Sequence, residues 1–153
     1  MKLQGKTALV TGGATGIGYG IAKALAAEGC RVAISGRRED ALKTAAAEWS
    51  GQPAMIYRAC DVGDRAGVNA LFDWATKQLG RIDILVNAAG TNIKNRSMAE
   101  MRPEQFDEVM AANSTGIYSN DSRRREREGA LTPGTRSNDS RWREREGALT
   151  RGT

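Results

Sequence analysis

A strand-to-helix segment with three spaced glycines is the part of this sequence best suited to bind a phosphate. Thr7–Val10 is a short apolar run, and Thr11–Gly18 after it reads TGGATGIG. Gly12 permits a sharp turn, while Gly16 and Gly18 keep side chains away from a helix N-terminus whose N–H groups can bind pyrophosphate. The alternative is a tight turn without a ligand. The dinucleotide contacts expected here are Gly12, Gly16, Ile17 and Gly18.

Two arginines after the second predicted strand indicate which dinucleotide is bound. Arg37 and Arg38 follow the apolar run Val32–Ile34, beside the expected adenosine ribose. Gly36 holds the position where an acidic residue would accept hydrogen bonds from a 2′-hydroxyl, whereas arginine favours a 2′-phosphate. The sequence therefore predicts NADP(H) in preference to NAD(H). The alternative is a pair of solvated charges.

Further candidate residues follow the third and fourth predicted strands, at the sheet edge where ligands of parallel sheets bind. Asp61 could hold an adenine amino group, or it could cap the next helix, a role that Asp64 could also fill. Residues 87–90 read NAAG and end the fourth strand. The cofactor contacts expected here are Asp61, Val62, Asn87, Ala88 and Gly90.

Apolar periodicity predicts the elements that position these residues. Strands are predicted at 7–10, 31–35, 54–60 and 82–86, and helices follow the first three of them. The first two of those helices carry Ile17, Ile21 and Leu25, and Leu42, Ala45, Ala46 and Trp49. The third carries Val68, Leu71, Phe72, Ala75 and Leu79. Gly29 and Gly80 are placed to end the first and third helices. This alternation predicts an α/β fold, a truncated Rossmann-type parallel sheet of about four strands with flanking helices.

A fourth helix is predicted to begin at Pro103, which suits a first helical turn. Phe106, Val109 and Met110 share one face with Asn113. A polar residue on this otherwise apolar face is either functional or a partly exposed surface residue. No later segment suits a fifth strand, so the edge at 82–86 is expected to be uncovered.

An arginine-rich tandem repeat begins at Ser119. Residues 119–135 and 137–153 differ only at Arg124/Trp142 and Pro133/Arg151. Two copies with so few apolar residues cannot bury a core, so we divide the chain into a Rossmann portion, 1–118, and a disordered tail, 119–153. The repeat indicates either an interrupted reading frame or an arginine-rich nucleic-acid-binding module. Glutamates between the arginines argue against a nucleic-acid partner.

Composition excludes several classes of chemistry. The net charge of the chain is +5, and residues 119–153, with nine Arg and six acidic residues, supply +3 of it. Without histidine the chain has no Ser-His-Asp triad and no imidazole metal ligand. Cys30 and Cys60 are expected to be free and buried. No signal-peptide pattern or membrane-length apolar run is present, so a cytoplasmic protein without a membrane partner is expected.

Together these motifs resemble the short-chain dehydrogenase/reductase family over about residues 6–118. Thr11-Gly12-x-x-x-Gly16-x-Gly18 is similar to the family's glycine motif, and Asp61 to its adenine-contacting acid. Residues 87–90 resemble its Asn-Asn-Ala-Gly motif, with Ala88 in place of the second Asn. Asn113 resembles the asparagine of its catalytic tetrad. The resemblance implies an NAD(P)-dependent oxidoreductase that transfers hydride between nicotinamide and a small alcohol or ketone.

The same resemblance covers only the first half of a typical family member. It implies a Tyr as general acid/base, a Lys four residues later and a Ser that orients the carbonyl. None has a counterpart after Tyr118, and the one Tyr-x-x-x-Lys match, Tyr19 and Lys23, lies on the first predicted helix. We therefore expect the chain as written to be truncated and inactive, a nucleotide-binding pseudoenzyme being the alternative. Its oligomeric state stays open.

Overall fold

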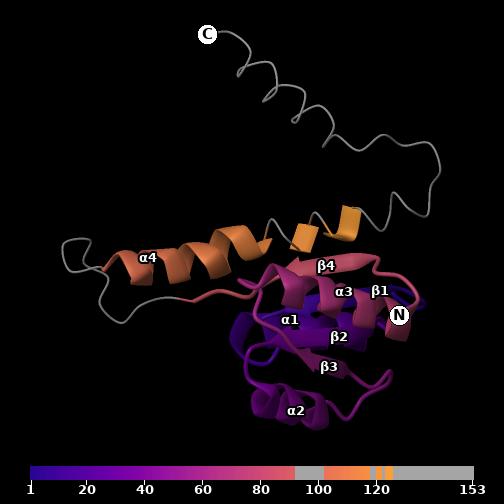
Figure 1. Ribbon diagram of the computed structural model, residues 1–153. Coiled ribbons are helices and arrows are strands. Elements are labelled where there is room, and N and C mark those ends of the chain that lie inside the picture. Colours follow the sequence, from indigo (N-terminus) through magenta and orange to yellow (C-terminus); the bar gives the residue numbers. More distant parts are fainter. Residues whose placement is uncertain (92–101, 118–119, 122, 126–153) are drawn as a thin grey trace, which may run out of the picture.

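Four parallel strands form the central sheet, with the first strand in its interior (Figure 1). The computed structural model describes residues 1–91, 102–117, 120–121 and 123–125. The strands are β1 (Thr7–Thr11), β2 (Arg31–Gly36), β3 (Ile56–Ala59) and β4 (Ile84–Asn87), in the order β3-β2-β1-β4. In the register, Ala8 of β1 lies opposite Val32 on one side and Ile84 on the other. Every β1 residue is buried, as a strand covered on both faces requires.

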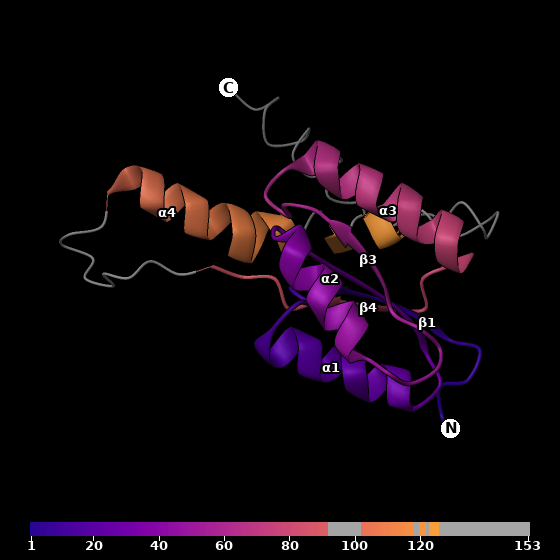
Figure 2. The same cartoon turned by 90° about the horizontal axis from the view of Figure 1, so that it is seen from below.

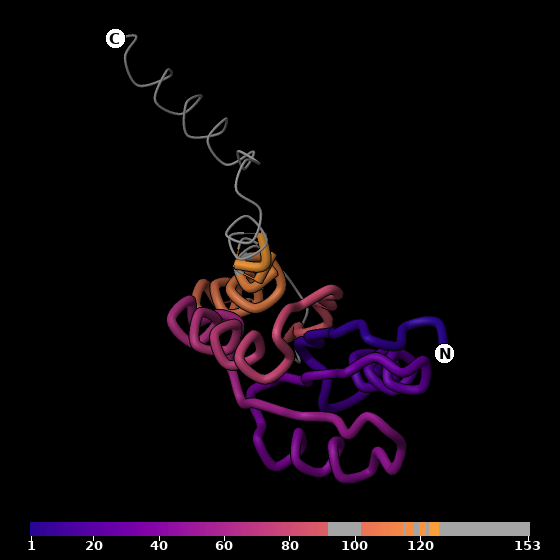
Figure 3. Tube along the Cα trace, turned by 90° about the vertical axis from the view of Figure 1, so that its right-hand side faces the viewer, coloured from indigo at the N-terminus to yellow at the C-terminus, as the bar shows by residue number. Residues whose placement is uncertain are grey.

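Helices cover both faces of this sheet. Those that cover it are α1 (Gly16–Ala27), α2 (Glu39–Glu48) and α3 (Arg65–Leu79). A further helix, α4 (Pro103–Met110), continues into a π-helical turn, η1 (Ala111–Thr115). Figure 2 shows α1 and α2 on one side of the strands and α3 on the other. In Figure 3 the indigo α1 and the magenta α3 again lie on opposite sides. The predicted α/β class, with about four parallel strands and flanking helices, is confirmed.

Alternation along β1 builds two apolar cores, because successive side chains of a strand point to opposite faces. Ala8 and Val10 belong to the core under α1 and α2, and Leu9 belongs to the core under α3. The α3 face was predicted in full, since all five of its apolar positions are buried: Val68, Leu71, Phe72, Ala75 and Leu79. Burial of each large side chain in this way contributes about 1.5–3 kcal/mol to the free energy of folding.

Helix α1 buries its row of small residues instead of its larger apolar row. Gly18, Ala22 and Ala26 are buried against the sheet, whereas Ile17 is 82% exposed. The four-residue spacing predicted the helix correctly but did not show which row faces the sheet. Glycine and alanine on the inner side let the helix axis approach the strands closely.

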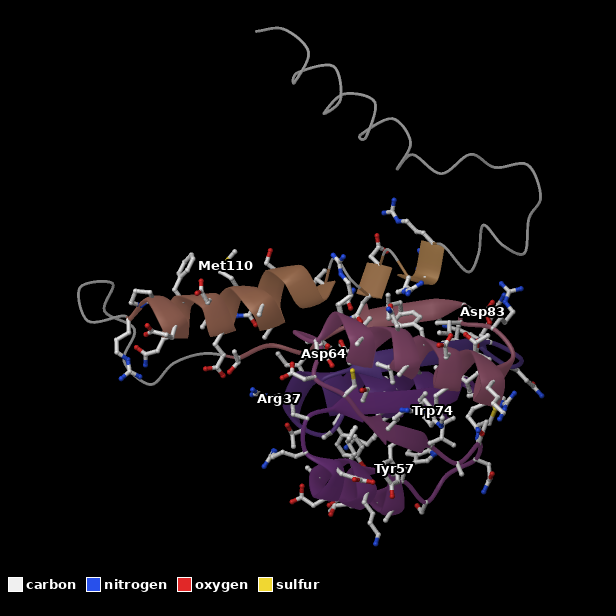
Figure 4. The ribbon with its side chains drawn as sticks, viewed as in Figure 1. Arg37, Tyr57, Asp64, Trp74, Asp83 and Met110 are labelled. Carbon is white, nitrogen blue, oxygen red and sulfur yellow. The ribbon has the colours of Figure 1, made fainter. Side chains whose placement is uncertain are left out.

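The fourth helix and the two edge strands, β3 and β4, are the least covered elements. Within the described residues α4 buries no side chain, and its Phe106 and Met110 are 47% and 42% exposed. Met110 points away from the sheet in Figure 4. β4 forms one edge of the sheet, and all four of its residues are partly exposed, as predicted for an edge at 82–86.

Most of the tandem repeat lies outside the described residues, and with it the prediction of a disordered tail. The exceptions are Asn120, Asp121 and 123–125, which are helical. Asn120 is buried, and its Nδ2 donates a hydrogen bond to Asn87 Oδ1 at 2.9 Å. Arg123 Nε donates to Asn69 Oδ1 on α3. The start of the repeat therefore contacts the predicted Rossmann portion.

One carboxylate joins the beginnings of β1 and β4. Asp83 Oδ2 accepts hydrogen bonds from the backbone N–H of Thr7 at 3.0 Å and from its hydroxyl at 3.1 Å. Asp83 Oδ1 lies 2.6 Å from Arg81 Nη2 and 3.9 Å from Lys6 Nζ. Burial alone would raise the pKa of this carboxyl, but the Thr7 hydrogen bonds and the two cations outweigh burial and lower it.

We predict that Asp83→Asn destabilises the protein by about 1.5–3 kcal/mol at pH 7, the usual value of hydrogen bonds to a charged group. Because the folded pKa is depressed, this contribution is complete above the ordinary value of 3.8 and is lost as the pH falls through the lower folded value. Urea unfolding of both proteins from pH 7 to pH 3 measures it. A difference between the two proteins that does not shrink at acidic pH would contradict this role of the Asp83 charge.

Candidate functional site

A cavity of about 460 Å³ lies at the carboxyl ends of the strands, within the size range of small-molecule sites. Figure 4 shows Arg37 and Asp64 at this end of the sheet and Asp83 at the opposite end. Most of the predicted site residues line the cavity: Gly12, Ile17, Gly18, Arg37, Arg38, Asp61, Val62, Ala88 and Gly90. The topology therefore brings together residues that are up to 78 positions apart in the sequence.

Three predicted site residues do not line this cavity. Gly16 is exposed at the first position of α1, with φ +56°. Asn87 ends β4 and accepts the hydrogen bond from Asn120. Asn113 is exposed within η1.

Close backbone contacts explain two of the glycines. A Cβ on Gly12, whose φ is +67°, would lie 2.5 Å from the carbonyl oxygen of Ala88. A Cβ on Gly18 would lie 2.2 Å from the carbonyl oxygen of Gly12. Both distances are shorter than a van der Waals contact, so neither position has space for a side chain. By contrast, a Cβ on Gly16 would meet nothing within 4 Å, and only its positive φ requires glycine.

The N-terminus of α1 opens toward the same cavity. Thr15 is the residue before the helix, and its side chain makes no capping hydrogen bond. Its backbone is extended, and Thr15 lines the cavity together with Ile17 and Gly18. The first N–H groups of a helix carry partial positive charge and attract anions. The turn could therefore hold a phosphate group through its backbone.

The predicted ribose end of the cavity carries two exposed arginines, Arg37 and Arg38, immediately after β2. Arg37 Nη1 lies 3.6 Å from Glu108 Oε1 of α4, and both side chains are more than half exposed. Sequence reasoning missed Glu108. No pattern in the neighbouring sequence indicated a role for Glu108, because only the packing of α4 brings it close to Arg37.

Asp61 and Asp64 have different roles, which the sequence left open. Asp64 caps α3, since its carboxylate accepts hydrogen bonds from the N–H groups of Ala66 and Gly67, each at 3.0 Å. Asp61 Oδ1 accepts from the N–H of Gly63 at 2.9 Å and lines the cavity. The capping role therefore belongs to Asp64, and the Asp61 carboxylate lies at the cavity wall.

Asn113 fixes the segment that follows β4. Its Oδ1 accepts a hydrogen bond from the N–H of Thr91 at 2.9 Å, and its Nδ2 donates to the Thr91 carbonyl at 2.8 Å. A Cβ on Gly90 would lie 2.8 Å from Asn113 Oδ1. The π-helical turn presents Asn113 to this segment, and such turns occur frequently at functional sites. Asn113 thus positions the cavity wall at Gly90 and Thr91, both of which line the cavity.

Cys60 also lines the cavity, but its chemistry is inert. Cys30 and Cys60 are both free and buried, as predicted. Burial, followed by the nearby Asp61 and Asp64 carboxylates, raises the pKa of the Cys60 thiol to about 11. The thiol is therefore protonated at neutral pH and is not a nucleophile.

Within residues 1–91 and the described portions of 102–125, no cluster of three His, Cys, Asp or Glu side chains could hold a metal ion. Among the same residues, no helix has both the length and the apolar character needed to cross a membrane.

Known proteins resemble the first 120 residues of this chain. A family model described as short chain dehydrogenase matches residues 6–120. The D-threitol dehydrogenase of Mycolicibacterium smegmatis is 40% identical over 118 residues, which cover 76% of this chain and 45% of that protein. The chain thus spans about half the length of the first curated relatives it matches.

Two solved structures with bound dinucleotides are similar as well. A 3-ketoacyl-(acyl-carrier-protein) reductase from Brucella melitensis, complexed with NADH, is 36% identical with a TM-score of 0.74, over 79% of this chain and 49% of that one. A short chain dehydrogenase from Burkholderia cenocepacia, in complex with NADP, is 31% identical with a TM-score of 0.77, over 82% of this chain and 52% of that one. One neighbour holds NADH and the other NADP, so they do not indicate a preference for this chain.

Two glycines on α1 give a matched test of the close approach at the turn. We predict that Gly18→Ala destabilises the protein by about 1–3 kcal/mol, the usual cost of overpacking. Gly20→Ala, where a Cβ meets nothing within 4 Å, should stabilise it by about 0.5–1 kcal/mol through helix propensity. Urea unfolding measures both changes. Equal effects of the two substitutions would show that the contact between Gly18 and Gly12 does not constrain the turn.

Proposed function

The chain belongs to the short-chain dehydrogenase family, and from this membership we propose that residues 1–118 form its portion that binds the nicotinamide dinucleotide. One observation carries the proposal. The side-chain-free turn at Gly12 and Gly18 and the N-terminus of α1 face the same cavity as Arg37 and Asp61. A phosphate at the turn and an adenosine beside β2 would match these groups.

Each group in the cavity has a distinct part in this proposal. Backbone N–H groups at Gly16, Ile17 and Gly18 bind the pyrophosphate, and the positive φ of Gly12 lets the chain turn sharply toward them. The Asp61 carboxylate and the adjacent Val62 hold the adenine. Ala88 and Gly90, which follow β4, form a further wall of the site, and Asn87 at the end of β4 holds the start of this segment in place.

We further propose that NADP(H) is preferred to NAD(H). Arg37 and Arg38 lie at the cavity, and Gly36 supplies no carboxylate for a 2′-hydroxyl. A guanidinium binds a phosphate through two parallel hydrogen bonds, which a hydroxyl cannot match.

The whole protein would transfer hydride between nicotinamide and the carbon of a small ketone or alcohol, which is the chemistry that the dinucleotide supplies. Asn113 would hold the wall beside the nicotinamide end. The Tyr, Lys and Ser that complete this chemistry in the family have no counterpart after residue 118. We therefore propose that these 153 residues, as written, bind the dinucleotide without reacting it, in the cytoplasm.

We predict that the full chain binds NADPH more tightly than NADH in calorimetric titrations. The double substitution Arg37→Gln/Arg38→Gln should weaken NADPH binding by about tenfold to a hundredfold, as expected for lost hydrogen bonds to a charged group. NADH binding should stay within about twofold, because the lost partner is the 2′-phosphate. Lys43→Gln, an exposed charge on α2, is the control. Tighter NADH than NADPH binding by the unmodified chain would refute the preference.

We also predict that the chain consumes no NADPH with small ketones, because loss of the general acid alone costs about 10²–10⁴ in rate. Absorbance of the reduced nicotinamide measures this. The D-threitol dehydrogenase of M. smegmatis, assayed in the same reductive direction with the ketone formed by oxidation of D-threitol, is the positive control. A rate close to that of the control would overturn the proposal that these residues do not react the dinucleotide.

A further inference from the structure

An ion pair crosses the predicted ribose end of the site and joins two elements that are distant in sequence. Arg37 follows β2 and Glu108 lies on α4, with 3.6 Å between Arg37 Nη1 and Glu108 Oε1. The two side chains are 55% and 59% exposed. Solvent-exposed pairs of this kind contribute little to stability. A stronger anion can therefore displace the glutamate from the guanidinium.

A second cavity of about 300 Å³ adjoins this pair. Arg37 and Asp61 line both this cavity and the larger one. Three carboxylates surround the smaller cavity: Asp61, Asp64 and Glu108. Asp64 is held as the cap of α3 and Asp61 by the N–H of Gly63. Of the three carboxylates, Glu108 forms the ion pair with Arg37, the arginine that we expect to bind the 2′-phosphate.

We propose that Glu108 is a specificity-determining residue whose carboxylate competes with the 2′-phosphate of the dinucleotide for Arg37. The inference rests on the proposed dinucleotide site and adds a residue to it. A 2′-phosphate must replace the Glu108 carboxylate on the guanidinium and then lies beside a negative charge. A 2′-hydroxyl carries no charge, so it neither has to displace the Glu108 carboxylate nor is repelled by it. Glu108 therefore moderates the preference for NADP(H) that Arg37 and Arg38 create.

Two nucleotides that differ only in the group at issue provide the test. Adenosine 2′,5′-bisphosphate carries the 2′-phosphate, and 5′-AMP does not. We expect Glu108→Gln in the full chain to tighten binding of the bisphosphate by about threefold to fivefold at low salt, the effect that exposed charge pairs commonly have. Binding of 5′-AMP should change by less than about 1.5-fold, because it has no group at the position for which Glu108 competes. Titration calorimetry measures both affinities.

Glu104→Gln is the matched control, since Glu104 lies one turn earlier on the same helix, is exposed, and is absent from the lining of both cavities. It should change neither affinity. In an Arg37→Gln background, the gain from Glu108→Gln should fall below about 1.5-fold, because the residue for which the two anions compete is gone. A gain that persists undiminished in that background would overturn the competition.

The outcomes also separate this inference from the function on which it rests. If the unmodified chain binds both nucleotides but Glu108→Gln leaves their affinity ratio unchanged, the role of Glu108 is refuted and the dinucleotide site stands. If the unmodified chain binds neither nucleotide, the proposed site is refuted and the role of Glu108 falls with it.

Discussion

The close approach of three backbone segments at the carboxyl end of β1 is the constraint on which the candidate site depends. Gly12 follows β1, Gly18 lies in the first turn of α1, and Ala88 follows β4. Hypothetical Cβ atoms at the two glycines would lie 2.5 Å and 2.2 Å from carbonyl oxygens. Only hydrogen atoms fit there, so the turn can be tight enough to direct the N-terminus of α1 at the cavity. The backbone N–H of Ala88 donates to the Thr11 carbonyl at 3.2 Å and so holds the end of β4 against the turn.

Thr11 and Asp83 hold β4 in register with β1 at opposite ends. Thr11, buried at the carboxyl end, has its hydroxyl 3.4 Å from both the Val86 carbonyl and the Ala89 N–H. Asp83, at the amino end, accepts the N–H of Thr7. Both side chains thus support a strand that lies at the sheet edge and is only partly covered. The position of the cavity wall at Ala88, Ala89 and Gly90 depends on this support.

Electrostatics at the site is a balance between fixed and displaceable charges. The partial positive charge at the α1 terminus is part of the backbone and cannot be displaced. The carboxylate of Asp64 is committed to the N-cap of α3. By contrast, Arg37 and Glu108 meet in solvent, through long side chains from two separate elements. In the proposed site, affinity for a phosphate at the turn would therefore be set by the fold, whereas discrimination at the ribose would depend on exposed side chains.

Local patterns in the sequence determined the fold class, the family and most of the cavity lining. Glycines at 12, 16 and 18, the apolar face of α3 and the helix-ending Gly29 and Gly80 are signals within a few residues, because turn conformation and helix periodicity are local properties. Residues after the strands could be assigned to one edge because parallel strands share their carboxyl ends.

Only the tertiary structure decided which side chains meet. The periodicity of α1 did not show that Gly18, Ala22 and Ala26 face the sheet while Ile17 is exposed. Three side-chain contacts join residues that are distant in the sequence. They are the hydrogen bonds Asp83–Thr7 and Asn113–Thr91 and the ion pair Arg37–Glu108, whose members lie 76, 22 and 71 positions apart. Such contacts follow from how the strands are ordered and the helices packed, and no short-range pattern encodes them. The sequence thus determined the family and the residues at the cavity, and the packing decided which charges surround that cavity.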